Sequence, residues 1–71
     1  MPLSILDAGD EGEIILIKGK EEQKRFIANL GFVLGEKVKV ISQNKGDVIV
    51  TVKGTRVALG ASLANKITVR V

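Results

Sequence analysis

The chain contains no histidine, cysteine, tryptophan or tyrosine, and its 71 residues include one proline and two phenylalanines. Without cysteine or histidine it can form no disulfide, no Cys/His zinc site and no Ser–His or Cys–His nucleophile pair. A histidine-based pH switch is excluded as well. These absences remove most catalytic and metal-binding chemistries. We therefore predict a protein that is not an enzyme and that carries no cofactor.

Long apolar runs and a large net charge are also missing. The longest aliphatic run extends only from Ile14 to Ile17, whereas a membrane-spanning helix needs about 20 residues. The first residues, Met1 to Ser4, show no basic region before an apolar stretch, so no secretory signal is expected. We expect a cytoplasmic protein. A chain of this size supports one hydrophobic core, so residues 1–71 are predicted to form a single domain.

Short Val/Ile-rich segments that follow turn residues predict β-strands. The four consecutive aliphatic residues of the first segment suit a strand that is covered on both faces or bent around a small barrel. The second and last segments alternate apolar and polar residues, as strands with one buried face do. The predicted strands are Glu13–Lys18, Lys37–Ile41, Asp47–Lys53, Arg56–Leu59 and Ile67–Val71.

The third and fourth predicted strands are close enough to form a hairpin. Gly54-Thr55 as its two turn residues would give a type II′ turn, with Lys53 opposite Arg56. Two cations placed opposite each other would be unfavourable by about 0.2–1 kcal/mol. This register places one set of apolar side chains on the core face: Val48, Val50, Val52, Val57 and Leu59.

The segment Lys20–Leu30 is rich in helix-forming residues and is predicted to be an α-helix. Phe26, Ile27 and Leu30 would form its apolar stripe toward the sheet. Gly31 would end the helix in the left-handed conformation, with Phe32 folding back onto Ile27 as in a Schellman cap. A further helical or 3₁₀ turn is expected at Ser62–Ala64. These elements predict a mostly β fold, an SH3-like barrel of about five strands with one short helix after the first strand.

Val33 and Leu34 lie in the short connection between the helix and the second strand, where both are hard to bury. They could simply close the end of the barrel, because scattered exposed aliphatic residues are normal. Alternatively, they form an apolar contact for a partner protein, with a rim of cations that steers association. The cations that could form this rim are Lys24 and Arg25 from the helix and Lys53 and Arg56 from the hairpin.

Two other kinds of binding deserve weighing. Asp7, Asp10, Glu11 and Glu13 could supply hard oxygen ligands, but their spacing is not that of a defined ligand loop, and a polar turn explains them. A net charge of +3, with acids interspersed among the cations and no aromatic stacking platform, argues against nucleic-acid binding. A small nucleic-acid-binding or transcription-regulatory barrel is the alternative function.

The order of glycines and aliphatic residues resembles the FeoA family of ferrous iron transport accessory proteins. Leu30-Gly31-Phe32-Val33-Leu34-Gly35 is similar to the family's "LG-hydrophobic-x-PG" signature. The likeness covers nearly the whole chain and continues through Gly46-Asp47, Gly54 and Val57-Ala58-Leu59. Three residues depart from the pattern: Leu34 and Val48 stand where proline is frequent, and Gly60 where arginine often follows.

The resemblance implies a non-enzymatic, cytoplasmic SH3-like barrel that assists or regulates ferrous iron uptake by binding the transporter FeoB. The expected contact is FeoB's cytosolic G-protein-like domain or its membrane-proximal region, so the domain would meet the membrane only through the transporter. The family's domain is also fused to some metal-responsive transcriptional repressors, but this chain has no helix-turn-helix. The stand-alone accessory is therefore the better match. Stoichiometric binding of Fe²⁺ or Zn²⁺ is not expected.

Overall fold

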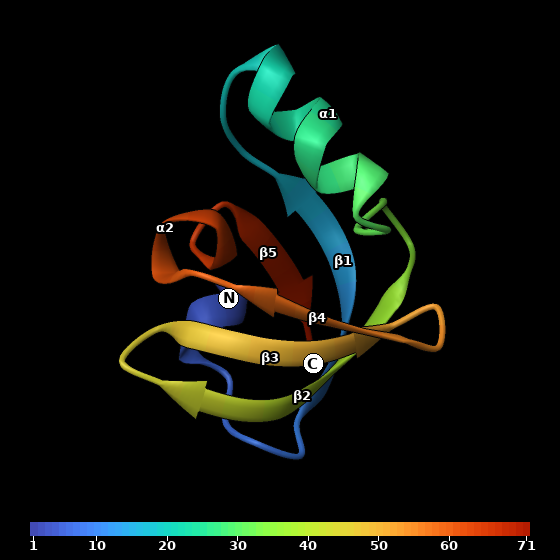
Figure 1. Ribbon diagram of the computed structural model, residues 1–71. Coiled ribbons are helices and arrows are strands. Elements are labelled where there is room, and N and C mark those ends of the chain that lie inside the picture. Colours follow the sequence, from blue (N-terminus) through green and yellow to red (C-terminus); the bar gives the residue numbers. More distant parts are fainter.

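Five strands form one antiparallel sheet in the computed structural model, which describes residues 1–71 (Figure 1). The strand order is β4-β3-β2-β1-β5, and no ladder joins β4 to β5. The predicted mostly β class, with a helix after the first strand, is confirmed. In chain order the elements are the 3₁₀ helix η1 (Leu3–Ile5), β1 (Glu11–Ile17), α1 (Glu21–Asn29), β2 (Lys37–Asn44), β3 (Asp47–Val52), β4 (Thr55–Leu59), α2 (Ala61–Ala64) and β5 (Ile67–Arg70).

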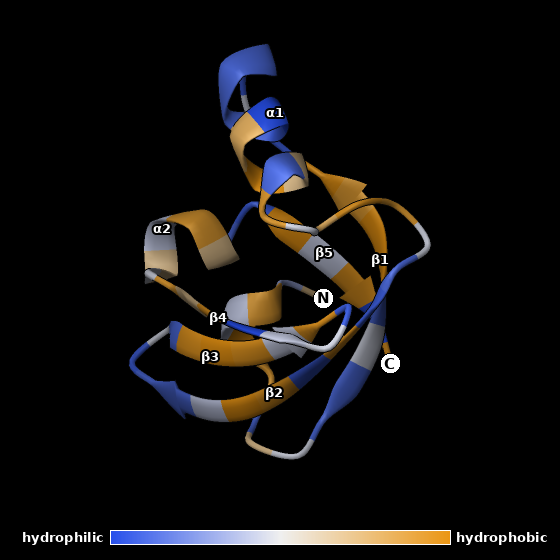
Figure 2. Cartoon of the chain, turned by 45° about the vertical axis from the view of Figure 1, so that its right-hand side comes forward, coloured by the Kyte–Doolittle hydropathy of each residue, from blue (hydrophilic) through white to orange (hydrophobic).

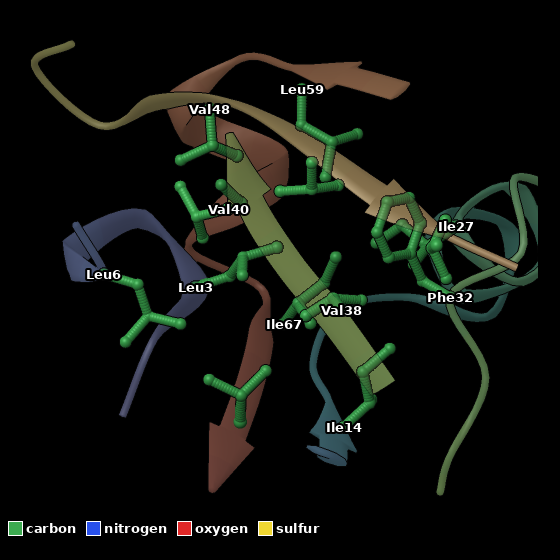
Figure 3. Close-up of a cluster of buried hydrophobic side chains, with 14 residues drawn as sticks. Leu3, Leu6, Ile14, Ile27, Phe32, Val38, Val40, Val48, Leu59 and Ile67 are labelled. Atoms are coloured by element: carbon green, nitrogen blue, oxygen red, sulfur yellow. The ribbon is translucent and has the colours of Figure 1, made fainter. Parts of the chain in front are cut away.

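The core is almost entirely aliphatic and lies on the inner face of the sheet (Figure 3). Alternation decides which side chains of β2 and β3 enter it, because successive residues of a strand point to opposite faces. The core face predicted for the hairpin is confirmed: Val48, Val50, Val52 and Leu59 are buried, and Val57 is half-buried against them.

The hairpin between β3 and β4 has a different turn from the predicted one. Val52 pairs with Thr55, so the turn residues are Lys53 and Gly54 rather than Gly54 and Thr55. Both turn residues have positive φ (51° and 74°), as a type I′ turn requires, and this turn matches the twist of the two strands. Arg56 therefore lies opposite Thr51 and not opposite Lys53. Because the turn moves by one residue, each pairing moves by two, and the buried face is unchanged.

The first strand is bent and is not covered on both faces. Its register against β5 shifts between Ile14 and Leu16, which is a β-bulge. Ile14 is buried, whereas Ile15 and Leu16 are exposed. The bent alternative of the sequence prediction is therefore confirmed, and the doubly covered one is wrong. The bulge allows four consecutive aliphatic residues in a strand without burying all of them.

Helix α1 ends as predicted. Gly31 has φ of 108°, its N–H donates to the Ala28 carbonyl (2.9 Å), and the Phe32 N–H donates to the Ile27 carbonyl (3.3 Å). This pair of bonds is the Schellman motif. The Phe32 and Ile27 side chains are both fully buried and lie side by side at one end of the core (Figure 3).

The predicted burial of Phe26 is wrong, because its side chain is 53% exposed. Consecutive residues of a helix point roughly 100° apart. When Ile27 points into the core, Phe26 can face the sheet only if the helix lies flat across it. Instead, α1 extends outward from one end of the sheet, and only its last turn approaches the core (Figure 1). Leu30 is partly buried there.

The N-terminal segment is also part of the core, which the sequence analysis did not predict. Leu3, the first residue of η1, and Leu6, which follows it, are buried, and Pro2 forms a β-bridge with Thr68 of β5. The turn expected at Ser62–Ala64 is present as α2. None of the helices has the length and apolar character needed to cross a membrane.

Candidate protein-binding groove

A shallow apolar groove of about 330 Å³ lies where β1, α1 and the loop after α1 meet. We call it the loop groove. Six of its seven lining residues are hydrophobic. They come from the end of β1, from one face of α1 and from the loop: Leu16, Ile17, Lys24, Ala28, Phe32, Val33 and Leu34. Figure 2 shows the apolar loop residues beside the apolar end of β1.

Backbone bonds hold the loop of the groove at both ends. The Schellman cap fixes its start at Gly31 and Phe32. At its other end, the Gly35 N–H donates to the Ile14 carbonyl (2.8 Å), and the Ile14 N–H donates to the Glu36 carbonyl (2.9 Å). Gly35 adopts φ of 87°, a conformation that glycine reaches without steric cost. Residues 33 and 34 are therefore presented by a backbone that is ordered before any partner binds.

Leu34 is the most exposed apolar residue of the groove lining, at 66%, whereas Val33 is half-buried. The expectation that this short loop cannot bury both side chains is confirmed for Leu34. The Leu34 side chain lies mostly in solvent, so its role as a partner contact stays a prediction beside the alternative of a scattered exposed aliphatic residue. Phe32, in contrast, forms the floor of the groove and belongs to the core.

The structure brings together three of the six predicted contact residues. Val33, Leu34 and Lys24 all line the loop groove. Lys53 lies nearby, because its ammonium nitrogen is 3.9 Å from the carboxylate of Glu36, two residues after Leu34. Arg25 and Arg56 are exposed but do not line the groove.

The sequence analysis did not predict four of the lining residues as contacts: Leu16, Ile17, Ala28 and Phe32, the last of which it placed against Ile27. The run of four aliphatic residues in β1 contained the relevant signal. A strand with one buried face cannot bury four consecutive side chains on that face, so some of them had to be exposed or covered by another element. Only the position of α1 shows which element lies beside them.

Two of the four candidate ligand residues near the start of β1, Asp10 and Glu13, have other partners. The Asp10 carboxylate accepts the N–H of Asp7 (2.9 Å), which closes a turn. Glu13 forms an ion pair with Arg70 (2.9 Å). No group of three or more acidic side chains converges anywhere in the chain. That the domain takes up no stoichiometric metal stays a prediction.

The cations of the sheet do not form a continuous positive surface. Lys37 lies opposite Glu13 and Lys39 opposite Glu11, so the charges of β1 and β2 alternate in sign across the sheet. A phosphate backbone is recognised by grouped cations. The loop groove, which is apolar with one ammonium group at its edge, is suited instead to an apolar side chain of a protein.

Comparison with known proteins agrees with the fold and places the chain among iron transport proteins. The FeoA domain family matches residues 1–71. A protein of Methanocaldococcus jannaschii named Fe(2+) transport protein A is 38% identical over 63 residues, which are 83% of this chain and 76% of the relative.

Two crystal structures show the same architecture. One, described as the iron uptake regulatory protein FeoA, is 31% identical and superposes with a TM-score of 0.94 over 99% of this chain and 95% of its own. The other is FeoA from Stenotrophomonas maltophilia in complex with zinc, described as a prokaryotic SH3 domain protein. It is 29% identical, with a TM-score of 0.83 over 99% of this chain and 89% of its own. The SH3-like fold predicted from the sequence is confirmed.

Proposed function

The chain belongs to the FeoA domain family, and on this basis we propose that it is a cytoplasmic accessory module of ferrous iron transport that acts by binding the transporter FeoB through the loop groove. Family membership supports the accessory role in ferrous iron transport. FeoB as the partner, the cytoplasmic location and the use of the loop groove are our proposals. The module acts by binding and not by catalysis.

One observation carries the choice of surface. Leu34 is 66% exposed, yet it stands on a loop whose backbone is bonded at both ends. An exposed leucine on a fixed loop loses little conformational entropy on binding, and an anchor of this kind contributes strongly to affinity. Val33 and Leu16 extend the apolar surface beside it.

The cations around the groove are proposed to steer association. Lys24 lines the groove itself, and Arg25 follows it on α1. Lys53 is near the loop through its weak, exposed pair with Glu36. Charges at the rim of an interface change association rates and salt dependence more than affinity. Lys24→Glu is therefore expected to slow association with FeoB, most clearly at low salt.

Binding of the purified cytosolic part of FeoB to a Leu34→Asp variant tests the proposal. The free energy of unfolding, measured by urea denaturation, should stay within about 0.5 kcal/mol of that of the parent, since Leu34 is exposed. Affinity should fall at least about tenfold, or ~1.4 kcal/mol. Ferrous iron uptake by cells that carry the variant should fall with it.

Ile5→Asp provides the matched control. Ile5 is 56% exposed, and it lies in η1, which packs against α2, β3 and β5 rather than beside α1. The control makes the same chemical change at similar exposure and should bind and support uptake normally. Equal losses in both variants, or normal binding by Leu34→Asp, would show that the loop groove is not the contact.

A further inference from the structure

The two edges of the sheet are protected very differently. At the β5 edge, Pro2 bridges to Thr68, and the Val69 N–H donates to the Met1 carbonyl (2.8 Å). The N-terminal segment therefore covers that edge. The β4 edge has no neighbouring strand, and no helix packs along it. Thr55, Arg56 and Ala58 are exposed, and Val57 is half-buried.

The β4 edge lacks several of the usual defences against strand addition, although it is short and carries one charged side chain, Arg56. Natural edge strands are blunted by proline, by bulges or by covering elements. The register of β4 against β3 runs through five pairs without a shift, so β4 contains no bulge, and it contains no proline. The bulges of this sheet lie instead between β1 and β5 and between β2 and β3.

The turn geometry shows which backbone groups are free. The two-residue turn is closed by Val52 and Thr55, which form a hydrogen-bonded pair. In an antiparallel ladder, bonded and non-bonded pairs alternate. The pair of Val57 with Val50 is therefore bonded, whereas the N–H and C=O groups of Arg56 and Ala58 point away from β3. No other backbone bond accounts for these groups.

The side chains beside this edge determine what could bind there. Arg56 is exposed and forms no ion pair. Ala58 lies next to Ile49 of β3 and lines a hollow of about 310 Å³. Gly60 closes the end of this hollow and presents no side chain to a neighbour. The outer side of the edge thus offers a cation and, two residues further along, a hollow whose lining is half apolar: Val48, Ile49, Ala58 and Leu59, beside Ser42, Asn44, Asp47 and Gly60.

We propose that β4 is a second binding site, which takes up an extended, acidic and apolar segment of a partner protein as a sixth, antiparallel strand. Such a segment would exchange backbone bonds with Arg56 and Ala58. Its carboxylate would lie opposite Arg56, and an aliphatic side chain two positions away would lie opposite Ala58. Backbone bonds supply affinity in strand addition, and alternate side chains supply specificity. A second copy of this chain fits less well, because pairing centred on Val57 would leave each Arg56 opposite an alanine.

Amide hydrogen exchange of the full chain by NMR, with and without a capped probe peptide of sequence TETITETI, tests the proposal. This peptide presents alternating glutamate and isoleucine on one face. In the free chain, the Arg56 and Ala58 amides should exchange quickly and those of Val57 and Leu59 slowly. Saturating peptide should slow exchange at Arg56 and Ala58 at least about tenfold. Fast exchange that the peptide does not change would overturn the proposal.

Two matched comparisons separate strand addition from unspecific binding. Arg56→Glu should weaken binding of the glutamate peptide at least about threefold and favour its lysine counterpart TKTITKTI. Methylation of the peptide's glutamate and isoleucine backbone nitrogens should abolish binding to the unaltered protein. The proposal of strand addition would be contradicted if the methylated peptide still binds, or if the affinity does not depend on the charge of residue 56.

The second site is independent of the loop groove and can fail separately. Ala58→Pro removes only an N–H that points to solvent, a position where edge strands tolerate proline. The affinity of Ala58→Pro for the peptide should fall at least about tenfold, whereas Leu34→Asp should bind the peptide with unchanged affinity. If Leu34→Asp loses the peptide as well, the peptide occupies the loop groove and the edge proposal is wrong. A dimer in sedimentation, with Arg56 and Ala58 already protected without peptide, would assign the edge to a second copy and overturn the proposal too.

Discussion

The meander of β2, β3 and β4 and the half built from β1, α1 and the following loop use their apolar residues differently. In the meander, apolar side chains alternate into the core, and two tight Lys-Gly turns connect the strands. In the other half, Ile15, Leu16, Phe26 and Leu34 are 43–66% exposed, whereas the exposed large apolar residues of the meander, Ile41 and Ile49, are 39% and 38% exposed. A bulge, a helix that points outward and a fixed loop are the causes. The meander therefore supplies regular core packing, whereas the other half displays apolar surface around the loop groove.

The two phenylalanines provide the largest test of this difference. Phe32 is fully buried and joins the loop to the core of the meander, whereas Phe26 is 53% exposed. Phe32→Ala should lower the free energy of unfolding by about 3–5 kcal/mol, because it leaves a cavity. Phe26→Ala should change it by less than about 1 kcal/mol. Urea denaturation measures both changes. Similar losses of free energy of unfolding in the two variants would mean that the Phe26 side chain is packed against the core.

Substitutions of Gly31, at the end of α1, should have the next largest effect on the free energy of unfolding. Gly31 has φ of 108°, and a Cβ there would lie 3.6 Å from a Val52 methyl, an ordinary contact. Gly31→Ala should therefore cost about 1–2 kcal/mol through backbone strain alone. Gly31→Asn should cost less, since asparagine tolerates positive φ better. Equal losses for the two variants in urea denaturation would assign the cost to crowding instead.

Substitution of the lysines in the two Lys-Gly turns of the meander should raise the free energy of unfolding. Lys45 and Lys53 both have positive φ (55° and 51°), where asparagine is preferred at this position of a type I′ turn. Lys45→Asn should raise the free energy of unfolding by about 0.5 kcal/mol. Lys39→Asn, in the middle of β2, should not stabilise, because asparagine is disfavoured in strands. A thermal unfolding series checks the pair, and a stabilising Lys39→Asn would contradict the explanation from turn geometry.

The smallest effects concern the two surface ion pairs. Glu13 and Arg70 lie 2.9 Å apart and join β1 to β5, whereas Lys53 and Glu36 lie 3.9 Å apart between the hairpin and the loop. A double-mutant cycle should give about 0.2–1 kcal/mol for the first pair and less for the second. Both couplings should shrink in high salt. A larger coupling for Lys53 and Glu36 would mean that this pair holds the loop against the meander.

The sequence predicted the meander well because its structure follows from local rules. Alternation in Val38 and Val40 and in Val48 to Val52 determines the buried face whatever the turn is. This is why the core face was right although the turn was placed one residue too late. The Schellman cap was predictable for the same reason, since Gly31 and Phe32 act within one helical turn.

The loop groove was only partly predictable. Residues 33 and 34 could be identified as hard to bury, because their connection is short. Leu16 and Ala28 could not be assigned to the same groove, since their proximity depends on where α1 lies relative to β1. The cations beside the groove were harder to predict, because the sequence pattern of long exposed side chains does not show which surface they lie next to. Two of the predicted cations, Arg25 and Arg56, lie outside the groove lining.

By itself, the sequence determined the residue chemistry, the strand faces and the helix end. These depend on which residue types are present and on contacts between residues near one another in the chain. Only the tertiary structure decided that Phe26 is exposed, that β1 bends at a bulge and that the β4 edge is left open. Each of these depends on how distant segments share a limited core, because a small barrel can bury only the side chains that its packed elements jointly enclose.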